Sequence, residues 1–142
     1  MALTNLLVEI GGELRGEGRR PDGRPWTVQI DGVAHTVDLE GLAVATSGDR
    51  WHLREHAGRR WSHTIDPRSG EPVDNALAAV TVLHPECMQA DALATVLTVL
   101  GPDEGLAFAD AQDIAALFIE RQLGGTSTRT RASRAWTGRR QA

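Results

Sequence analysis

Residues 77–102 read LAAVTVLHPECMQADALATVLTVLGP, and this stretch decides the fold that the sequence predicts. Its first seven residues, Leu77–Leu83, are a run of apolar and β-branched side chains typical of a strand, and Pro85 ends that strand. From about Cys87 to Leu100 the apolar residues recur at helical spacing, which indicates a helix that the following Gly-Pro pair stops. The sequence therefore predicts a strand followed directly by a helix.

Two faces of this helix differ in chemistry. Asp91 and Thr95 are four residues apart, so they project from one face, one turn above the other. A carboxylate and a hydroxyl offer two hard oxygen donors, which suits a Mg²⁺-like ion that leaves its other positions to phosphates. The alternative is a solvated face near a helix N-terminus, where the helix dipole favours Asp. The expected core face carries Leu93, Val96, Leu97 and Leu100.

Short strands and turns surround this unit. Leu6–Ile10 is interpreted as a buried strand that a tight turn at Gly11-Gly12 ends, and Asp31-Gly32 as the turn of a hairpin after Trp26–Ile30. The chemistry of Asp66–Gly70 is that of a turn. The other expected elements are strands at Leu42–Thr46, Trp51–Arg54, Arg60–Ile65 and Ile114–Ile119 and a second helix at Asp103–Ala111.

The order of these elements predicts the fold class. Leu42–Thr46 is expected to pair with Trp51–Arg54, and Arg60–Ile65 to continue the same sheet. Because several strands precede the helices, the pattern favours an α+β fold in which two helices cover a mainly antiparallel sheet. At 142 residues the chain has the length of one ordinary domain.

Composition excludes several classes of function. A net charge of -4 gives no general argument for nucleic-acid binding, and Cys87 as the single cysteine excludes an internal disulfide or a cysteine-rich metal site. The first residues lack the pattern of a signal peptide, and no apolar stretch was expected to reach membrane-spanning length. We therefore expect a cytoplasmic protein with no membrane and no nucleic-acid partner.

The last residues, 124–142, form a basic tail that is distinct from residues 1–123. The tail begins with a linker-like Gly-Gly-Thr-Ser-Thr run and contains five arginines. One interpretation is a frayed terminus. The alternatives are a terminal strand anchored by Trp136 and a patch that attracts an anionic partner.

His63 is the candidate catalytic residue. It lies in a Ser-His-Thr-Ile-Asp-Pro segment just before the predicted turn, and near neutral pH an imidazole can accept a proton from an attacking hydroxyl. The alternative is a structural or solvated histidine. Ile65 follows in the same segment and is equally consistent with core packing, and Asp66 is expected to cap the turn.

Six segments, in order, resemble one family, the FAD:protein FMN transferases, also called the ApbE family. The resemblance covers about residues 3–120. The matching segments are Asn5–Arg15, Ala45–Asp49, His63–Gly70 with Pro72, Ala79–Val82, Ala90–Thr95 and Leu100–Pro102.

The resemblance implies an ApbE-like domain over residues 1–123 and an enzyme that cleaves the pyrophosphate of FAD. Such an enzyme joins the FMN half to a Ser or Thr hydroxyl of an acceptor flavoprotein and releases AMP. By resemblance, Asp91 and Thr95 bind Mg²⁺, His63 is the base or lies near the phosphates, and Ile65 lines the flavin pocket. Some members carry a second carboxylate at the position of Ala94, which implies one metal ligand fewer here.

The resemblance is partial. Family members, many of them exported lipoproteins, carry an N-terminal portion that ends in a Gly-x-Ala-Lys-Gly-Tyr-like segment and builds much of the flavin pocket. This chain has no Lys and no Tyr. We therefore expect the C-terminal part of a transferase, incomplete alone, that forms a homo-oligomer or pairs with a complementary N-terminal chain. The alternatives are a non-catalytic flavin-binding or interaction module and a truncated gene fragment.

Overall fold

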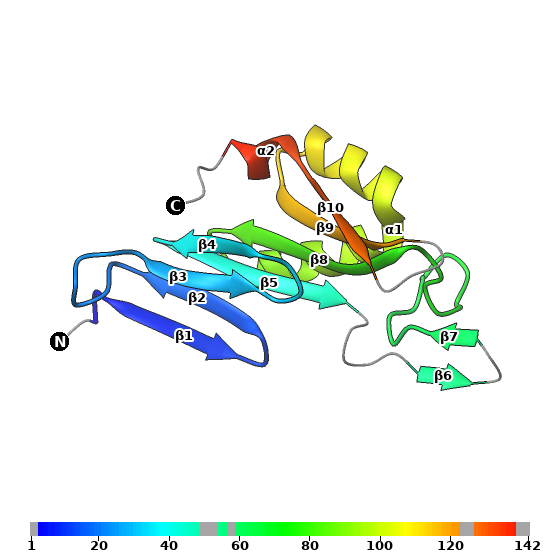
Figure 1. The fold of residues 1–142 in the computed structure, drawn as a ribbon, viewed down its shortest axis with the longest axis horizontal. Coiled ribbons are helices and arrows are strands. Elements are labelled where there is room, and N and C mark those ends of the chain that lie inside the picture. Colours follow the sequence, from blue (N-terminus) through cyan, green and yellow to red (C-terminus); the bar gives the residue numbers. More distant parts are fainter. Residues whose placement is uncertain (1–2, 49–53, 57–58, 123–126, 139–142) are drawn as a thin grey trace.

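A computed structural model describes residues 3–48, 54–56, 59–122 and 127–138 (Figure 1). Six strands form one antiparallel sheet in the order β1-β2-β5-β8-β9-β10. Two further hairpins and two helices complete the described part of the chain. The sheet strands are β1 Leu6–Ile10, β2 Glu13–Glu17, β5 Leu42–Gly48, β8 Leu77–His84, β9 Ala115–Arg121 and β10 Thr128–Ala132; the hairpins are β3 Trp26–Ile30 with β4 His35–Leu39 and β6 Arg54–His56 with β7 Arg59–Trp61; the helices are α1 Cys87–Ala111 and α2 Arg134–Thr137.

The sheet has a different cover on each face. Successive side chains of a strand point to opposite faces, so Val80 and Val82 of β8 contribute to one core and Ala79 and Leu83 to another. The first core lies beneath α1, and the second lies beneath the β3–β4 hairpin and α2. In Figure 1 the β3–β4 hairpin lies in front of the sheet. The predicted α+β fold with a mainly antiparallel sheet is confirmed.

A break at Gly101 divides α1 into two segments. Gly101 has φ 82° and ψ -179°, a conformation that residues with a Cβ rarely adopt, and Pro102 follows it. The two helices that the sequence predicts on either side of this Gly-Pro pair are therefore the two segments of one bent helix.

The buried stripe of α1 differs from the predicted core face. Val96 was expected to be buried but is 42% exposed, and Leu93 and Leu100 are only half-buried. Small side chains on the sheet-facing side allow α1 to approach the strands closely, and this turns Val96 toward solvent. The residues buried on α1 are Ala90, Ala94, Leu97, Thr98, Gly101, Gly105 and Ala109.

The strand β1 forms where predicted, but it is not buried. It is an edge strand with β2 as its one neighbour in the sheet, and Leu7, Val8 and Ile10 are exposed. Gly11 and Gly12 turn the chain between β1 and β2 with positive φ angles, as the expected tight turn requires.

The pairing predicted for the middle of the chain is also wrong. Among the described residues, β5 pairs with β2 and β8. Most of the expected strand Trp51–Arg54 lies outside the described residues. The strand expected to continue the sheet from Arg60 is instead β7, which pairs with β6 in a separate two-stranded hairpin. A sequence pattern indicates a strand but not its partner, which explains the error for the strand from Arg60.

The part of the tail that the structure describes is packed on the sheet. β10 pairs with β9, and Trp136 of α2 is buried in the second core. The buried carboxylate of Glu120 on β9 accepts hydrogen bonds from Arg129 and Arg131 of β10. Two basic residues of the tail thus neutralise a carboxylate inside the fold.

Helix α1 is also longer and more apolar than the sequence predicts. An 18-residue window within its 25 residues reaches a mean hydropathy of 1.3, enough by length and composition to cross a bilayer. Here it packs on β5, β8 and β9 and is interrupted at Gly101. It therefore covers one face of the sheet.

Candidate functional site

The segment that carries His63 and Ile65 folds as a short hairpin-like loop. The Val73 amide donates a hydrogen bond to the Thr64 carbonyl at 2.9 Å, and the Asp66 amide donates to the Glu71 carbonyl at the same distance. An isolated bridge pairs Ile65 with Pro72. The two sides of the loop are therefore held together by backbone hydrogen bonds.

The tip of this loop is the turn that the sequence predicts. The Gly70 amide donates to the Asp66 carbonyl at 2.8 Å, and the Arg68 amide donates to Asp66 Oδ1 at 2.9 Å. The Arg68 guanidinium also binds the Asp66 carboxylate, and this hydrogen bond holds the pKa of Asp66 below its usual range. Asp66 therefore caps the turn.

His63 and Ile65 are both exposed, and they flank the buried Thr64. The Ile65 side chain is 50% exposed, so it does not belong to either core. The Thr64 amide donates a hydrogen bond to Ser62 Oγ at 3.1 Å, which restrains Thr64. The loop thus presents an imidazole and an apolar side chain to solvent from a fixed backbone.

Asp91 and Thr95 lie on the first segment of α1, and both are exposed. Asp91 is also close enough to Cys87 to affect its ionisation: burial raises the pKa of the Cys87 thiol, and the carboxylates of Glu13 and Asp91 raise it further. A carboxylate and a hydroxyl one turn apart fit a Mg²⁺ ion that takes few protein ligands. Among the residues that the structure describes, no group of three His, Cys, Asp or Glu side chains is arranged to hold a metal.

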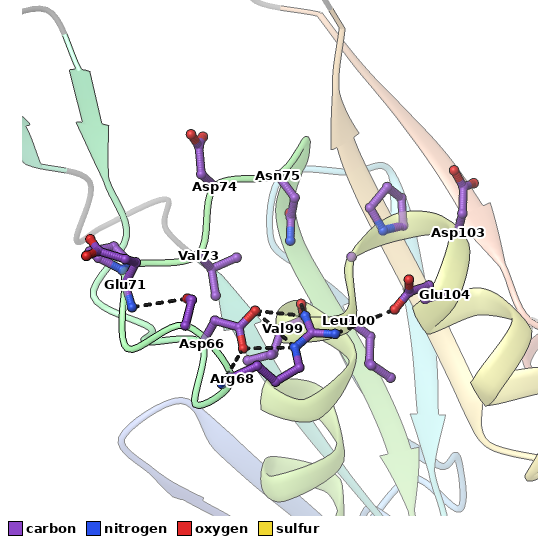
Figure 2. A pocket seen from close by; sticks show the side chains of 14 residues that line it. Asp66, Arg68, Glu71, Val73, Asp74, Asn75, Val99, Leu100, Asp103 and Glu104 are labelled. Carbon is purple, nitrogen blue, oxygen red and sulfur yellow. Dashed lines mark hydrogen bonds and ion pairs between the residues drawn. The ribbon is translucent and has the colours of Figure 1, made fainter.

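The loop and α1 meet at the helix break, as Figure 2 shows. Asn75 Nδ2 donates to the Thr98 carbonyl at 2.9 Å, Arg68 Nη2 lies 3.5 Å from the Val99 carbonyl, and Arg68 pairs with Glu104 at 3.8 Å. This junction borders a pocket of about 530 Å³ formed by residues of the loop and of the helix break.

None of the four predicted site residues lines this pocket. At 1.5 Å per residue, Thr95 lies about 6 Å and Asp91 about 12 Å along the helix axis from Val99. The structure therefore brings the His63 loop to the helix of Asp91 and Thr95, with the contact at the C-terminal end of that helix segment.

Asn75 is not predicted as a site residue from the sequence, and Arg68 is predicted only as part of a turn. A short polar side chain two residues before a buried strand is an available signal for Asn75. Its partner could not be identified in this way, because Thr98 is 23 residues further along the chain.

Comparison with known proteins shows the class to which this fold belongs. The model of the ApbE family matches residues 1–118, and the chain belongs to this family. It is 43% identical over 130 residues to the FAD:protein FMN transferase of Vibrio cholerae serotype O1, an alignment that covers 87% of this chain and 39% of that protein. The corresponding protein of Haemophilus influenzae is 38% identical over 134 residues, with 89% and 39% covered.

Solved structures show the same similarity. The apo form of the flavinyl transferase ApbE from Pseudomonas stutzeri superimposes with a TM-score of 0.85 and 47% identity over 94% of this chain and 42% of that one. The flavin transferase ApbE from Vibrio cholerae gives a TM-score of 0.83 and 39% identity over 95% and 44%. The chain thus spans about two fifths of the length of these relatives.

Proposed function

We propose that this chain is the part of a Mg²⁺-dependent FAD:protein FMN transferase that holds the metal and the catalytic base. The relatives named above carry that activity in their names, and the chain shares their fold over most of its length. The observation that carries the proposal is the hydrogen bond from Asn75 to Thr98, which joins the loop of His63 to the helix of Asp91 and Thr95.

In the proposed reaction, a Ser or Thr hydroxyl oxygen of an acceptor flavoprotein attacks the phosphorus on the FMN side of the FAD pyrophosphate. The bond from this phosphorus to the bridging oxygen breaks, and AMP leaves with that oxygen. The imidazole of His63 accepts the hydroxyl proton as the general base. Ile65 offers an exposed apolar side chain to the isoalloxazine ring.

Asp91 and Thr95 would hold Mg²⁺ through a carboxylate and a hydroxyl oxygen, leaving its other octahedral positions to phosphate oxygens and water. When bound, the ion supplies positive charge next to the pyrophosphate and the leaving AMP. Neither side chain is buried in the core, so both are accessible to such a ligand.

We further propose that this activity requires a second copy or a complementary chain. The chain spans about two fifths of its relatives' length, and its exposed β1 carries apolar side chains. A non-catalytic flavin-binding module is the second candidate, and the exposed Ile65 side chain is compatible with it, because such a module needs an apolar contact for the flavin ring but no metal.

Incubation with FAD, Mg²⁺ and an acceptor flavoprotein tests these functions. We expect the acceptor to gain the mass of one covalently attached FMN, with one AMP released per FMN transferred, when the remaining region of a relative is supplied in trans. EDTA should prevent both. FAD binding with neither AMP release nor acceptor modification would instead indicate the binding module.

A further inference from the structure

The break of α1 leaves the backbone carbonyl of Thr98 without its helical donor. In a continuous helix, the carbonyl of Thr98 would accept a hydrogen bond from the amide of residue 102. That residue is Pro102, which has no N–H, so the helix cannot supply this donor. An unpaired carbonyl at a helix end needs a partner from a side chain or from water.

Asn75 supplies that donor. Its Nδ2 donates to the Thr98 carbonyl at 2.9 Å, and its Oδ1 accepts a hydrogen bond from the Leu77 amide, also at 2.9 Å. Both ends of the side-chain amide are used, so its orientation is fixed. A Cβ on Gly101 would lie 3.5 Å from Asn75 Nδ2, which shows that the side chain packs against the break itself.

The contact extends to both halves of the candidate site. On the loop side, Val73 is two residues before Asn75 and donates to Thr64, the residue between His63 and Ile65. On the helix side, the Thr98 hydroxyl donates to the Ala94 carbonyl at 2.9 Å, next to Thr95. Three hydrogen bonds and the short stretches of backbone between them therefore connect the two halves.

We propose that Asn75 is a positioning residue that sets the loop of His63 and Ile65 relative to the helix of Asp91 and Thr95. The inference rests on the proposed function, because FAD would have to contact the loop with its ring and the metal with its pyrophosphate. Arg68 makes a second, weaker connection between the loop and α1, through the Val99 carbonyl and Glu104. A ligand that spans two elements binds well only when their separation matches it.

The test measures how strongly Mg²⁺ increases the affinity for FAD. Asn75→Asp has the same shape and keeps the acceptor for the Leu77 amide, but it places a carboxylate oxygen against the Thr98 carbonyl. We expect the Mg²⁺-dependent gain in FAD affinity to fall by about fivefold or more, the usual scale of coupling between two sites. Mg²⁺ affinity without FAD should not change, since both proposed ligands lie on α1.

Arginine variants provide a second test with a matched control. Arg24 binds Asp22 in the same way as Arg68 binds Asp66, two residues apart and through the backbone amide as well as the guanidinium. The contacts described for Arg24 are all with the β2–β3 connection. Arg68→Ala should reduce the Mg²⁺-dependent gain in FAD affinity, and Arg24→Ala should leave it unchanged.

Val37→Ala is the control for a general loss of stability, because it creates a cavity in the second core, away from the junction. If Asn75→Asp shows the same Mg²⁺-dependent gain in FAD affinity as the wild-type chain, the inference is wrong. If Val37→Ala loses as much of this Mg²⁺-dependent gain as Asn75→Asp does, the inference is wrong as well. A wild-type chain whose FAD affinity does not respond to Mg²⁺ even when the remaining region of a relative is supplied in trans would refute the proposed function itself, and the positioning role with it.

Discussion

Gly16 of β2 lies directly against Leu39 of β4. A Cβ on residue 16 would be 2.5 Å from the Leu39 carbonyl oxygen and 2.7 Å from the Leu39 Cβ. The Gly41 amide also donates to the Gly16 carbonyl at 3.0 Å. The β3–β4 hairpin can therefore cover the second core only because residue 16 has no side chain.

We expect Gly16→Ala to lower the free energy of unfolding by about 1–3 kcal/mol, the usual cost of inserting a methyl group into a closely packed region. Urea denaturation measures this. Gly138→Ala is the matched control, because Gly138 has φ -71° and an added Cβ would meet its nearest atom at 3.5 Å. Equal stability of the two variants would mean that the hairpin can shift to make room.

Asp91→Ala should abolish Mg²⁺-dependent FAD cleavage and leave the fold intact, because the Asp91 side chain is exposed. Thr95→Ala should weaken Mg²⁺ binding less, since a neutral hydroxyl contributes less than a carboxylate. Calorimetric titration with Mg²⁺ checks both variants, and the thermal transition checks their folding. Wild-type Mg²⁺ affinity in Asp91→Ala would exclude Asp91 as a ligand.

His63→Asn should slow flavin transfer by about 10²-fold or more while FAD still binds, as expected for the loss of a general base. The assay is acceptor modification under the conditions in which the wild-type protein is active. Full transfer activity in this variant would assign a structural role to His63.

Cys87 can report on a cation at Asp91. Burial and the Glu13 and Asp91 carboxylates raise the pKa of the Cys87 thiol, so its thiolate forms only at higher pH than in a free cysteine. A bound Mg²⁺ would favour the thiolate and lower this pKa. At fixed pH, alkylation of Cys87 by iodoacetamide should therefore become faster when Mg²⁺ is added.

The control for this experiment is Asp91→Asn, which removes the negative charge next to Cys87. Its thiol pKa should be lower than in the wild-type chain, and its alkylation rate should not respond to Mg²⁺. A wild-type rate that is independent of Mg²⁺ would argue against a metal at this position.

The exposed strand β1 should promote self-association. Val8 and Ile10 point to the same face of the strand, and Ile10 is 74% exposed. An exposed apolar patch on an edge strand favours pairing with another chain. We expect light scattering to show oligomers of the wild-type chain and a shift toward monomer in a Val8→Lys, Ile10→Lys variant.

The corresponding prediction for activity is that the chain transfers FMN only when the rest of a relative is supplied in trans. A monodisperse wild-type monomer that modifies an acceptor unaided would contradict both expectations.

Local signals in the sequence predicted most elements correctly. The Gly-Pro pair at 101 and 102, the β-branched run of β8 and the turn at Asp66–Gly70 each depend on nearby residues, and each forms as expected. The pairing of β5 with β8 could not be predicted, because strand pairing depends on contacts far apart in the sequence.

The same distinction holds for the candidate site. The helical spacing of Asp91 and Thr95 was sufficient to predict that they share an exposed face. Asn75 was missed because its role depends on a carbonyl that Pro102 leaves without a donor, a requirement that becomes visible only when the loop and the helix are placed together.

The contact between Asn75 and Leu77 has a consequence for the order in which the molecule opens. Leu77 begins β8, which lies between β5 and β9, whereas β1 and β10 each have one neighbour in the sheet. Deuterium should therefore enter the two outer strands first and β8 last. The junction of the candidate site is hydrogen-bonded to the slowest-exchanging strand, so it should keep its geometry through fluctuations that fray the rest of the sheet.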